Sequence, residues 1–303
     1  MDIGPRKPLS HPIKPDDWAA QVRGSLLMAA CADALGGGAQ AATPRRGEVY
    51  RPPMRFGIAT VRLLALTRHL AERQGAVDEQ VLSAEMSAVP ELATPSSRVD
   101  RIAPSGAPPS WIAPIGLIPG LGLTAVADSA RRAARAAIDN DEVVAAAVVQ
   151  AVGVALAARS SAVGRLRPVE FVRVLQMHAR HPTCAQGLGA AAEAAEAAND
   201  GLVDNLTRQF ADGDPVLSVT GVAVAAFLAH HDNPIAAIAA ALLAQGSNSD
   251  AGMMTAAMCG ARLGDQRTPP RWATRLQSSW LVWTASNHLA ALGRPVGRRQ
   301  SDR

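Results

Sequence analysis

From about residue 120 onward, the sequence is a nearly continuous series of alanine-rich segments with helical spacing. Prolines separate these segments, and each suits a helix start or the turn before one: Pro168, Pro182, Pro215, Pro234 and Pro269. Helices are predicted over residues 124–138, 141–158, 167–180, 185–198, 215–231, 234–245, 250–264 and 271–291. No window shows the strict alternation of a half-buried strand. The sequence therefore predicts an all-α fold.

Composition supports the same fold class. Hydrophobic residues make up 48% of the 303 residues and aromatic residues only 3%. Alanine, the strongest helix former, supplies much of the apolar total, whereas the β-branched and aromatic residues of sheets are comparatively few. Composition argues against an all-β or mostly disordered protein, and it excludes collagen-like and disulfide-rich classes.

The chain is expected to form one domain with a short extension at each end. Residues 1–15 carry four prolines and no periodic apolar pattern, which predicts a flexible arm. Residues 293–303 are predicted to be a basic flexible tail. Residues 16–292 between them suit a single compact multi-helix domain. Its first helix is expected over residues 18–35.

A second helix is expected from near Gly57 to residue 74, and a long proline- and glycine-rich stretch follows between Pro90 and Pro119. This stretch is too long for a simple connector and too apolar to be only a linker. Loops of such length inside compact domains are usually functional. The stretch is therefore predicted to be a functional loop.

Cysteine usage and the N-terminal sequence bear on the compartment. Cys31, Cys184 and Cys259 lie far apart in apolar helical segments without a C-x-x-C pair, which predicts buried thiols in a reducing compartment. The first residues lack the apolar core of a signal peptide. The most apolar run, residues 143–158, is shorter than the roughly 20 residues of a membrane span and is predicted to be a buried core helix. A cytoplasmic protein without a membrane partner is expected.

Positive charge comes almost entirely from arginine, because only Lys7 and Lys14 are lysines. The net charge of +4 and the pI of about 9.5 permit an anionic partner. No run of stacking aromatic residues interleaves with the arginines, so binding to nucleic acid is disfavoured.

Segments of the chain, read in order, resemble the motifs of the ADP-ribosylglycohydrolase family, which includes dinitrogenase-reductase-activating glycohydrolase. Residues 24–36, GSLLMAACADALG, are similar to G-x-L-L-G-x-A-x-G-D-A-L-G. Residues 55–66, RFGIATVRLLAL, stand where the family has W-T-D-D-T-A-M-A-L-A, with Phe56 at the tryptophan. Residues 111–117, WIAPIGL, resemble R-V-A-P-I-G-L.

The second half of the chain continues the resemblance. Residues 219–228 and 236–242 are similar to the helix pair before the last motif. Residues 245–261, QGSNSDAGMMTAAMCGA, resemble G-G-D-S-D-S-T-G-x-I-A-G-x-L-x-G-A, and PPRW at 269–272 resembles I-P-x-x-W. The resemblance covers roughly residues 18 to 285.

The resemblance implies an all-α ADP-ribosylglycohydrolase fold whose active members hydrolyse ADP-ribosyl bonds. It also implies two magnesium ions, held by the Thr-Asp-Asp-Thr and Asp-x-Asp motifs, because hard cations demand oxygen ligands. In the family these ions hold the ribose and activate water.

This chain departs from the implied ligand set in the first metal motif. Ile58 and Ala59 replace both aspartates, and only Thr60 is kept. Gln40 stands where the family has a glutamate shortly after the first helix.

The last motif departs as well. Ser247 and Ser249 stand at its two aspartate positions, and a shift of one residue would place Asn248 and Asp250 there instead. Both registers leave at most one carboxylate. Since magnesium usually needs one or two carboxylates per ion, no metal is expected in this chain.

Asp33 and Asp250 are the candidate catalytic residues, although each has a structural interpretation. Asp33 is expected to accept backbone hydrogen bonds, and Asp250 to cap a helix that begins at residue 251. The starts of the helices predicted at 57–74 and 250–264 are expected to line one cleft with these residues. Arg55 and Trp111 are predicted at its wall, for contact with an anionic group and for stacking; the alternative for Trp111 is a loop anchor in the core.

Histidines offer two weaker candidates. His230 and His231 precede Asp232 at a helix end, where solvated partners of the helix dipole are expected. His178 and His181 could share one helix face, but no third metal ligand is evident.

The leading hypothesis is a metal-free, non-hydrolytic member of this fold that acts in ligand binding, regulation or as a scaffold. Without the aspartates, the helix N-termini predict a preference for an uncharged or anionic ligand, such as one similar to ADP-ribose. One alternative is an enzyme with altered, metal-independent hydrolase or lyase-like chemistry that uses Asp33 or Asp250 as general acid or base. A second alternative is a nucleic-acid-associated protein.

Overall fold

Helices account for nearly all the regular structure in the computed structural model, which describes residues 15–38, 54–92, 109–160, 164, 166–197, 201–246 and 249–293. The α-helices are α1 (Pro15–Gly38), α2 (Ile58–Glu72), α3 (Glu79–Leu92), α4 (Leu123–Ala137), α5 (Asp141–Arg159), α6 (Pro168–Ala179), α7 (Pro182–Glu196), α8 (Leu202–Gln209), α9 (Pro215–Ala229), α10 (Pro234–Ala244), α11 (Ser249–Leu263), α12 (Pro270–Arg275) and α13 (Ser279–Ala291). Two 3-10 helices, η1 (Ser110–Leu117) and η2 (Asp265–Arg267), complete them. The described residues contain no strand, so the all-α prediction is confirmed.

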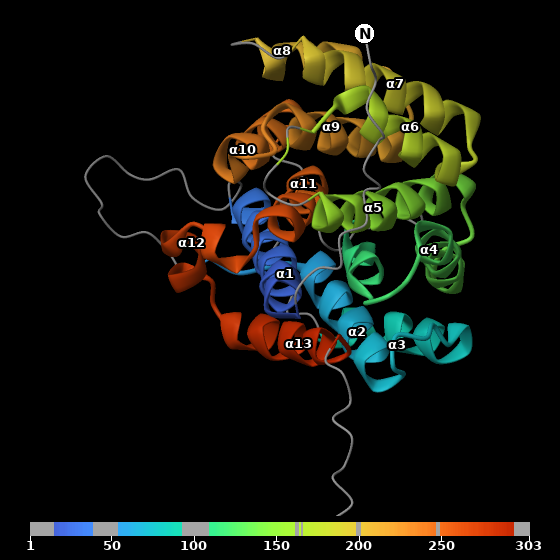
Figure 1. Ribbon diagram of the computed structural model, residues 1–303, viewed down its shortest axis with the longest axis vertical. Helices are drawn as coiled ribbons and strands as arrows, with labels where there is room; N and C mark the ends of the chain where they lie inside the picture. The colour runs from blue at the N-terminus through green and yellow to red at the C-terminus, as the bar shows by residue number, and fades with distance from the viewer. Residues whose placement is uncertain are drawn as a thin grey trace, which may run out of the picture.

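The helices are arranged around α1 and α11, which pack along each other in the centre of the molecule (Figure 1). At one end of the molecule lie α13, α2 and α3, and at the other lie α6 to α9. Almost every residue of α5 and α9 is buried. Helices without a polar face belong in a core, which explains the apolar, alanine-rich sequences of these two.

The α5 helix is long and apolar enough to cross a membrane by length and composition, but 83% of its most apolar window is buried inside the protein. It occupies the position of a core helix, as predicted. Its start is marked by Asn140, whose side chain accepts a hydrogen bond from the Val143 backbone N–H.

Glycines bring α1 and α11 close together. A Cβ atom on Gly260 would lie 2.2 Å from the backbone oxygen of Gly24, and one on Gly36 would lie 2.6 Å from the Cα of Ser249. Any side chain at these positions would push the helices apart. The contact fixes the start of α11 against the last turns of α1.

Polar caps and prolines start the helices of the second half. Asp214 and Asn233 accept backbone hydrogen bonds at the starts of α9 and α10, and a proline follows each. The α7 helix begins at Pro182, three residues before its predicted start, because His181 caps it by accepting from the Cys184 N–H.

Other parts of the structure differ from the prediction. The stretch expected to be a loop from Pro90 to Pro119 contains the 3-10 helix η1, all eight residues of which are buried. The α3 and α8 helices were not predicted. Residues 271–291 form two helices, because Leu276 pairs with Met54 and Ser278 has a φ of 59°.

The three cysteines are free and buried, as predicted. Burial raises the pKa of each thiol to about 12. Most of the predicted N-terminal arm and C-terminal tail lies outside the described residues.

Candidate functional site

The first part of the site is the contact between Asp33 on α1 and the start of α2. Oδ2 of Asp33 accepts hydrogen bonds from the backbone N–H of Gly57 at 2.8 Å and of Thr60 at 3.2 Å. The Thr60 hydroxyl donates to the same oxygen at 2.6 Å. Asp33 and Thr60 are buried. The carboxylate therefore acts as the acceptor for the N-terminus of α2, which is the structural role expected for it.

The second part of the site is the start of α11. This helix begins at Ser249, so Asp250 lies in its first turn and does not precede it as the expected cap. The Ser110 hydroxyl of η1 donates to Oδ1 of Asp250 at 2.5 Å. Because Ser249 lies against Gly36, the start of α11 and the start of α2 both meet the last turns of α1.

Arg62, in the second turn of α2, is a site residue that was not predicted from the sequence. Its side chain is half-buried, and burial lowers the pKa of the guanidinium while Asp250 acts in the opposite direction. Asp250 is thus close enough to interact electrostatically with Arg62. The available signal was that Arg62 occupies the methionine position of W-T-D-D-T-A-M-A-L-A.

Apolar side chains occupy the two positions where the family motif has its aspartates. Ile58 and Ala59 are half-buried and pack against the hydrophobic core. Within the described part of the chain, no group of three His, Cys, Asp or Glu side chains is placed to hold a metal ion. The Asp33 carboxylate is already bound by three protein donors.

Two residues, Trp111 and Arg55, were predicted at the wall of the cleft, with a loop anchor in the core as the alternative for Trp111. Trp111 is 2% exposed and belongs to the core of η1. Arg55 is exposed, and its Nε donates to Oε1 of Gln277 at 2.8 Å, beside the junction of α12 and α13. Gln40, Ser247 and Asn248 are outside the described residues.

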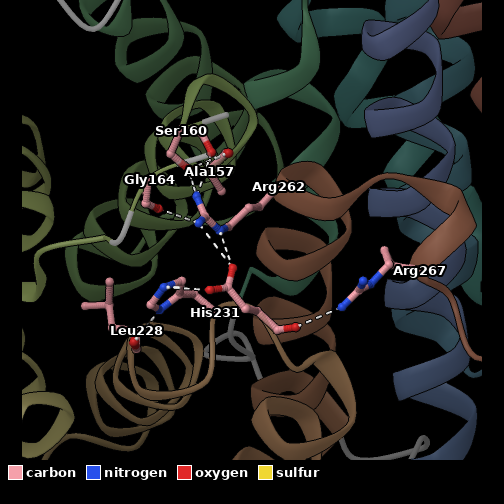
Figure 2. A network of polar contacts seen from close by, with 8 residues as sticks. Ala157, Ser160, Gly164, Leu228, His231, Arg262 and Arg267 are labelled. Atoms are coloured by element: carbon pink, nitrogen blue, oxygen red, sulfur yellow. Dashed lines mark hydrogen bonds and ion pairs between the residues drawn. The ribbon is translucent and has the colours of Figure 1, made fainter. Parts of the chain in front are cut away.

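The histidine groups are parts of the scaffold. His178 lies in the last turn of α6 and His181 caps α7, so the two histidines, which could have shared one helix face, belong to different helices. Nε2 of His231 lies 3.3 Å from Oδ2 of Asp232, whose Oδ1 binds Arg262 at 3.2 Å. Figure 2 shows this chain of contacts between the turn before α10 and the last turn of α11.

Comparisons with known proteins agree with this architecture. The model of the family described as ADP-ribosylglycohydrolase matches residues 14–299. A solved structure named "ADP-ribosylglycohydrolase-related protein complex" is similar with a TM-score of 0.62 and 18% sequence identity, over 92% of this chain and 100% of that chain. No curated protein matches the chain. The all-α fold and the match over residues 14–299 show that this chain belongs to the ADP-ribosylglycohydrolase family.

Proposed function

We propose that this chain is a non-hydrolytic member of the ADP-ribosylglycohydrolase family that binds a small organic ligand where α1, α2, η1 and α11 meet. The observation that carries the proposal is the environment of Asp33. Three protein donors bind one oxygen of this carboxylate, and Ile58 and Ala59 lie in the helix turn that supplies those donors. Two of the motif positions that the family uses for metal, Gly57 and Thr60, thus bind Asp33 and join two helices.

Electrostatics argues against a magnesium ion at this site. Magnesium gives up its water reluctantly and needs anionic ligands to offset that loss. Asp250 offers one carboxylate, already bound by Ser110, and Arg62 places a positive charge close to it. A divalent cation would meet repulsion from the guanidinium in addition to the shortage of ligands.

The same features favour a ligand that is uncharged or anionic. Arg62 carries a full positive charge in this region, and the N-terminus of α11 carries a partial one, whereas the Asp33 carboxylate already binds the N-terminus of α2. Such a site suits a role in binding, regulation or scaffolding, because none of these roles requires that a bond of the ligand be cleaved.

The test is hydrolysis and metal binding by the full chain. We expect no release of ADP-ribose from peptides modified on arginine or serine, at any magnesium concentration, and no change in Tm with magnesium. A saturating metal at 100 times its Kd would stabilise the fold by about 2.7 kcal/mol, which a melting experiment detects.

The matched variant restores both aspartates, Ile58→Asp with Ala59→Asp. If the natural chain binds no magnesium because it lacks these two carboxylates, the double variant should show a magnesium-dependent rise in Tm that the natural chain lacks. A rise in the natural chain that Asp250→Ala abolishes, or release of ADP-ribose by the natural chain, would contradict the proposal.

A further inference from the structure

The α13 helix lies at one end of the molecule and carries two exposed tryptophans (Figure 1). Trp280 is 65% exposed, Leu281 38% and Trp283 36%. Its buried residues form the side that packs against α1 and α2: Val282, Ser286, Leu289 and Ala290. With about 3.6 residues per turn, Trp280 lies on the opposite, solvent side of the helix, and Trp283 lies at the edge of that side.

The other tryptophans of the chain are covered. Trp111 is 2% exposed, and Trp18 and Trp272 pack against the hydrophobic core. A single exposed apolar side chain is ordinary in a folded protein, whereas a group of large ones on one helix marks a surface for contact. The exposed side of α13 is therefore a contact surface, here called the Trp280 surface, which consists of Trp280, Leu281 and Trp283.

The sequence around α13 is strongly basic. Residues 266–303 contain seven arginines and one acidic residue, Asp302, whereas the net charge of the whole chain is only +4. Three of these arginines precede α13, and the four that follow it lie outside the described residues. Within α13 itself, His288 is the only ionisable residue. An uncharged aromatic helix between basic segments favours an anionic partner.

The start of α13 lies close to described arginines. Nε of Arg55 donates to Oε1 of Gln277 at 2.8 Å, three residues before Trp280. Arg271 is exposed on α12, the helix that directly precedes α13. These two guanidinium groups place positive charge at the end of α13 that carries Trp280.

Acidic residues lie near the other end of α13. A Cβ atom on Gly293 would lie 2.9 Å from Trp18, which Asp16 and Asp17 precede in the sequence. The α2 helix also ends near there, at Glu72, and that carboxylate is paired with Arg68 and Arg73. The excess of positive charge is therefore beside Trp280.

We propose that the Trp280 surface binds the surface of an anionic lipid bilayer. Its apolar side chains enter the boundary between headgroups and acyl chains, where tryptophan is favoured, and the arginines around it attract the anionic headgroups. The sequence argued against a membrane partner because no segment was expected to span a bilayer, but a helix that lies on a bilayer needs no spanning segment. This inference goes beyond the proposed function and does not depend on a ligand near Asp33.

Charge argues against other occupants of this surface. A second copy of the chain would bring the same arginines, so two Trp280 surfaces in contact would repel each other. Binding of single-stranded nucleic acid uses cations that follow the backbone beside the stacking aromatic residues, and the 13 residues of α13 contain no arginine or lysine. A bilayer supplies diffuse negative charge next to an apolar layer, which suits exposed indoles with arginines around them.

The experiment is sedimentation of the full chain with two kinds of vesicle. One contains phosphatidylcholine alone, and the other contains equal parts of phosphatidylcholine and phosphatidylglycerol. We expect binding to the anionic vesicles to be tighter by about tenfold or more, and to weaken at high salt. Tryptophan emission should shift to shorter wavelength on binding, because indoles leave water.

Matched variants test the aromatic part of the surface. Trp280→Ser should weaken binding to the anionic vesicles by about tenfold, and Trp280→Phe should keep most of the binding while reducing the emission shift. Leu243→Ser is the control, because Leu243 on α10 is 64% exposed and lies outside the Trp280 surface. It should bind as the natural chain does.

The basic part is tested with two double variants of equal net charge. Arg55→Gln with Arg271→Gln should weaken binding to the anionic vesicles by about fivefold or more. Arg173→Gln with Arg208→Gln, at exposed positions on α6 and α8, should not. Circular dichroism confirms that each variant is folded.

Several results would overturn the inference. They are failure of the natural chain to bind the anionic vesicles, equal binding to both kinds of vesicle, and equal binding by the natural chain and Trp280→Ser. A dimer in solution that Trp280→Ser dissociates would assign the surface to a second copy instead. Tighter binding to a single-stranded oligonucleotide than to the vesicles would assign it to nucleic acid. Each of these results leaves the proposed ligand binding intact.

Discussion

The carboxylate of Asp33 and the hydroxyl of Thr60 lie 2.6 Å apart and join α1 to α2. The same oxygen accepts hydrogen bonds from two backbone N–H groups at the start of α2, so Asp33 caps this helix. The acceptor comes from another helix, so it fixes the position of α2 as well as its start.

Asp33→Ala is expected to lower the free energy of unfolding by about 1–3 kcal/mol, because it leaves buried donors without an acceptor. Thr60→Val removes one donor and keeps the backbone bonds, so it should cost less. Urea unfolding measures both. Equal stability of the natural chain and Asp33→Ala would contradict the capping role.

Gly260→Ala should destabilise the protein by about 1–3 kcal/mol or more, because the new methyl group would overlap the Gly24 backbone. Gly187→Ala is the matched control. It lies inside α7, where a Cβ atom would have nothing within 4 Å, so the same change should stabilise the helix by about 0.5–1 kcal/mol. Thermal melting distinguishes the two, and similar Tm values for both variants would disprove the close contact of α1 with α11.

The cysteines should be inert to thiol reagents in the folded protein. Burial raises the pKa of Cys31, Cys184 and Cys259 to about 12, so thiolate is scarce at pH 8 and the sulfur atoms are covered. We expect no reaction with a colorimetric disulfide reagent in buffer and three equivalents in denaturant. Fast labelling of a native thiol would show that its helix opens readily.

Stability should fall as the pH drops below about 6.5. Burial lowers the pKa values of His178 and His230 from their ordinary value of 6.5, with smaller contributions from Arg131 and Arg180 for the first and from His231 for the second. The unfolded chain therefore binds protons first as the pH falls, which favours unfolding, whereas above pH 7 both states are neutral. Urea midpoints at pH 7.5 and 5.5 measure the loss, and the His178→Gln, His230→Gln double variant should show less of it.

Much of the fold could be predicted from the sequence, because alanine-rich periodicity and prolines at helix starts are local signals. The starts of α9 and α10 follow from Asp214-Pro215 and Asn233-Pro234. The η1 helix was not predictable in this way, because it contains Pro114 and is held by burial on all sides. Tertiary packing, which no local pattern records, decides such a segment.

The candidate site was predictable only in part. The role of Asp33 could be predicted from its motif. An aspartate that is kept where the family's metal ligands are lost still needs hydrogen-bond donors. Arg62 was not predicted, because the comparison of motifs directs attention to positions where metal-ligating residues are lost. Arg62 stands at the methionine position of the motif, which does not bind metal in the family. Arg55 was predicted at the site from its place in the sequence, but the pairing of Met54 with Leu276 directs that segment toward Gln277.

The Arg262 side chain is 1% exposed and gathers acceptors from three separate parts of the chain. It donates to Ser160 after α5, to the Gly164 carbonyl and to Asp232 before α10 (Figure 2). If one of these segments moved away, the buried Arg262 guanidinium would lose hydrogen bonds and become exposed, which would also weaken its contacts with the other segments. The end of α5, the turn before α10 and the end of α11 should therefore open together as one cooperative unit in hydrogen exchange, although about a hundred residues of sequence separate the first from the last.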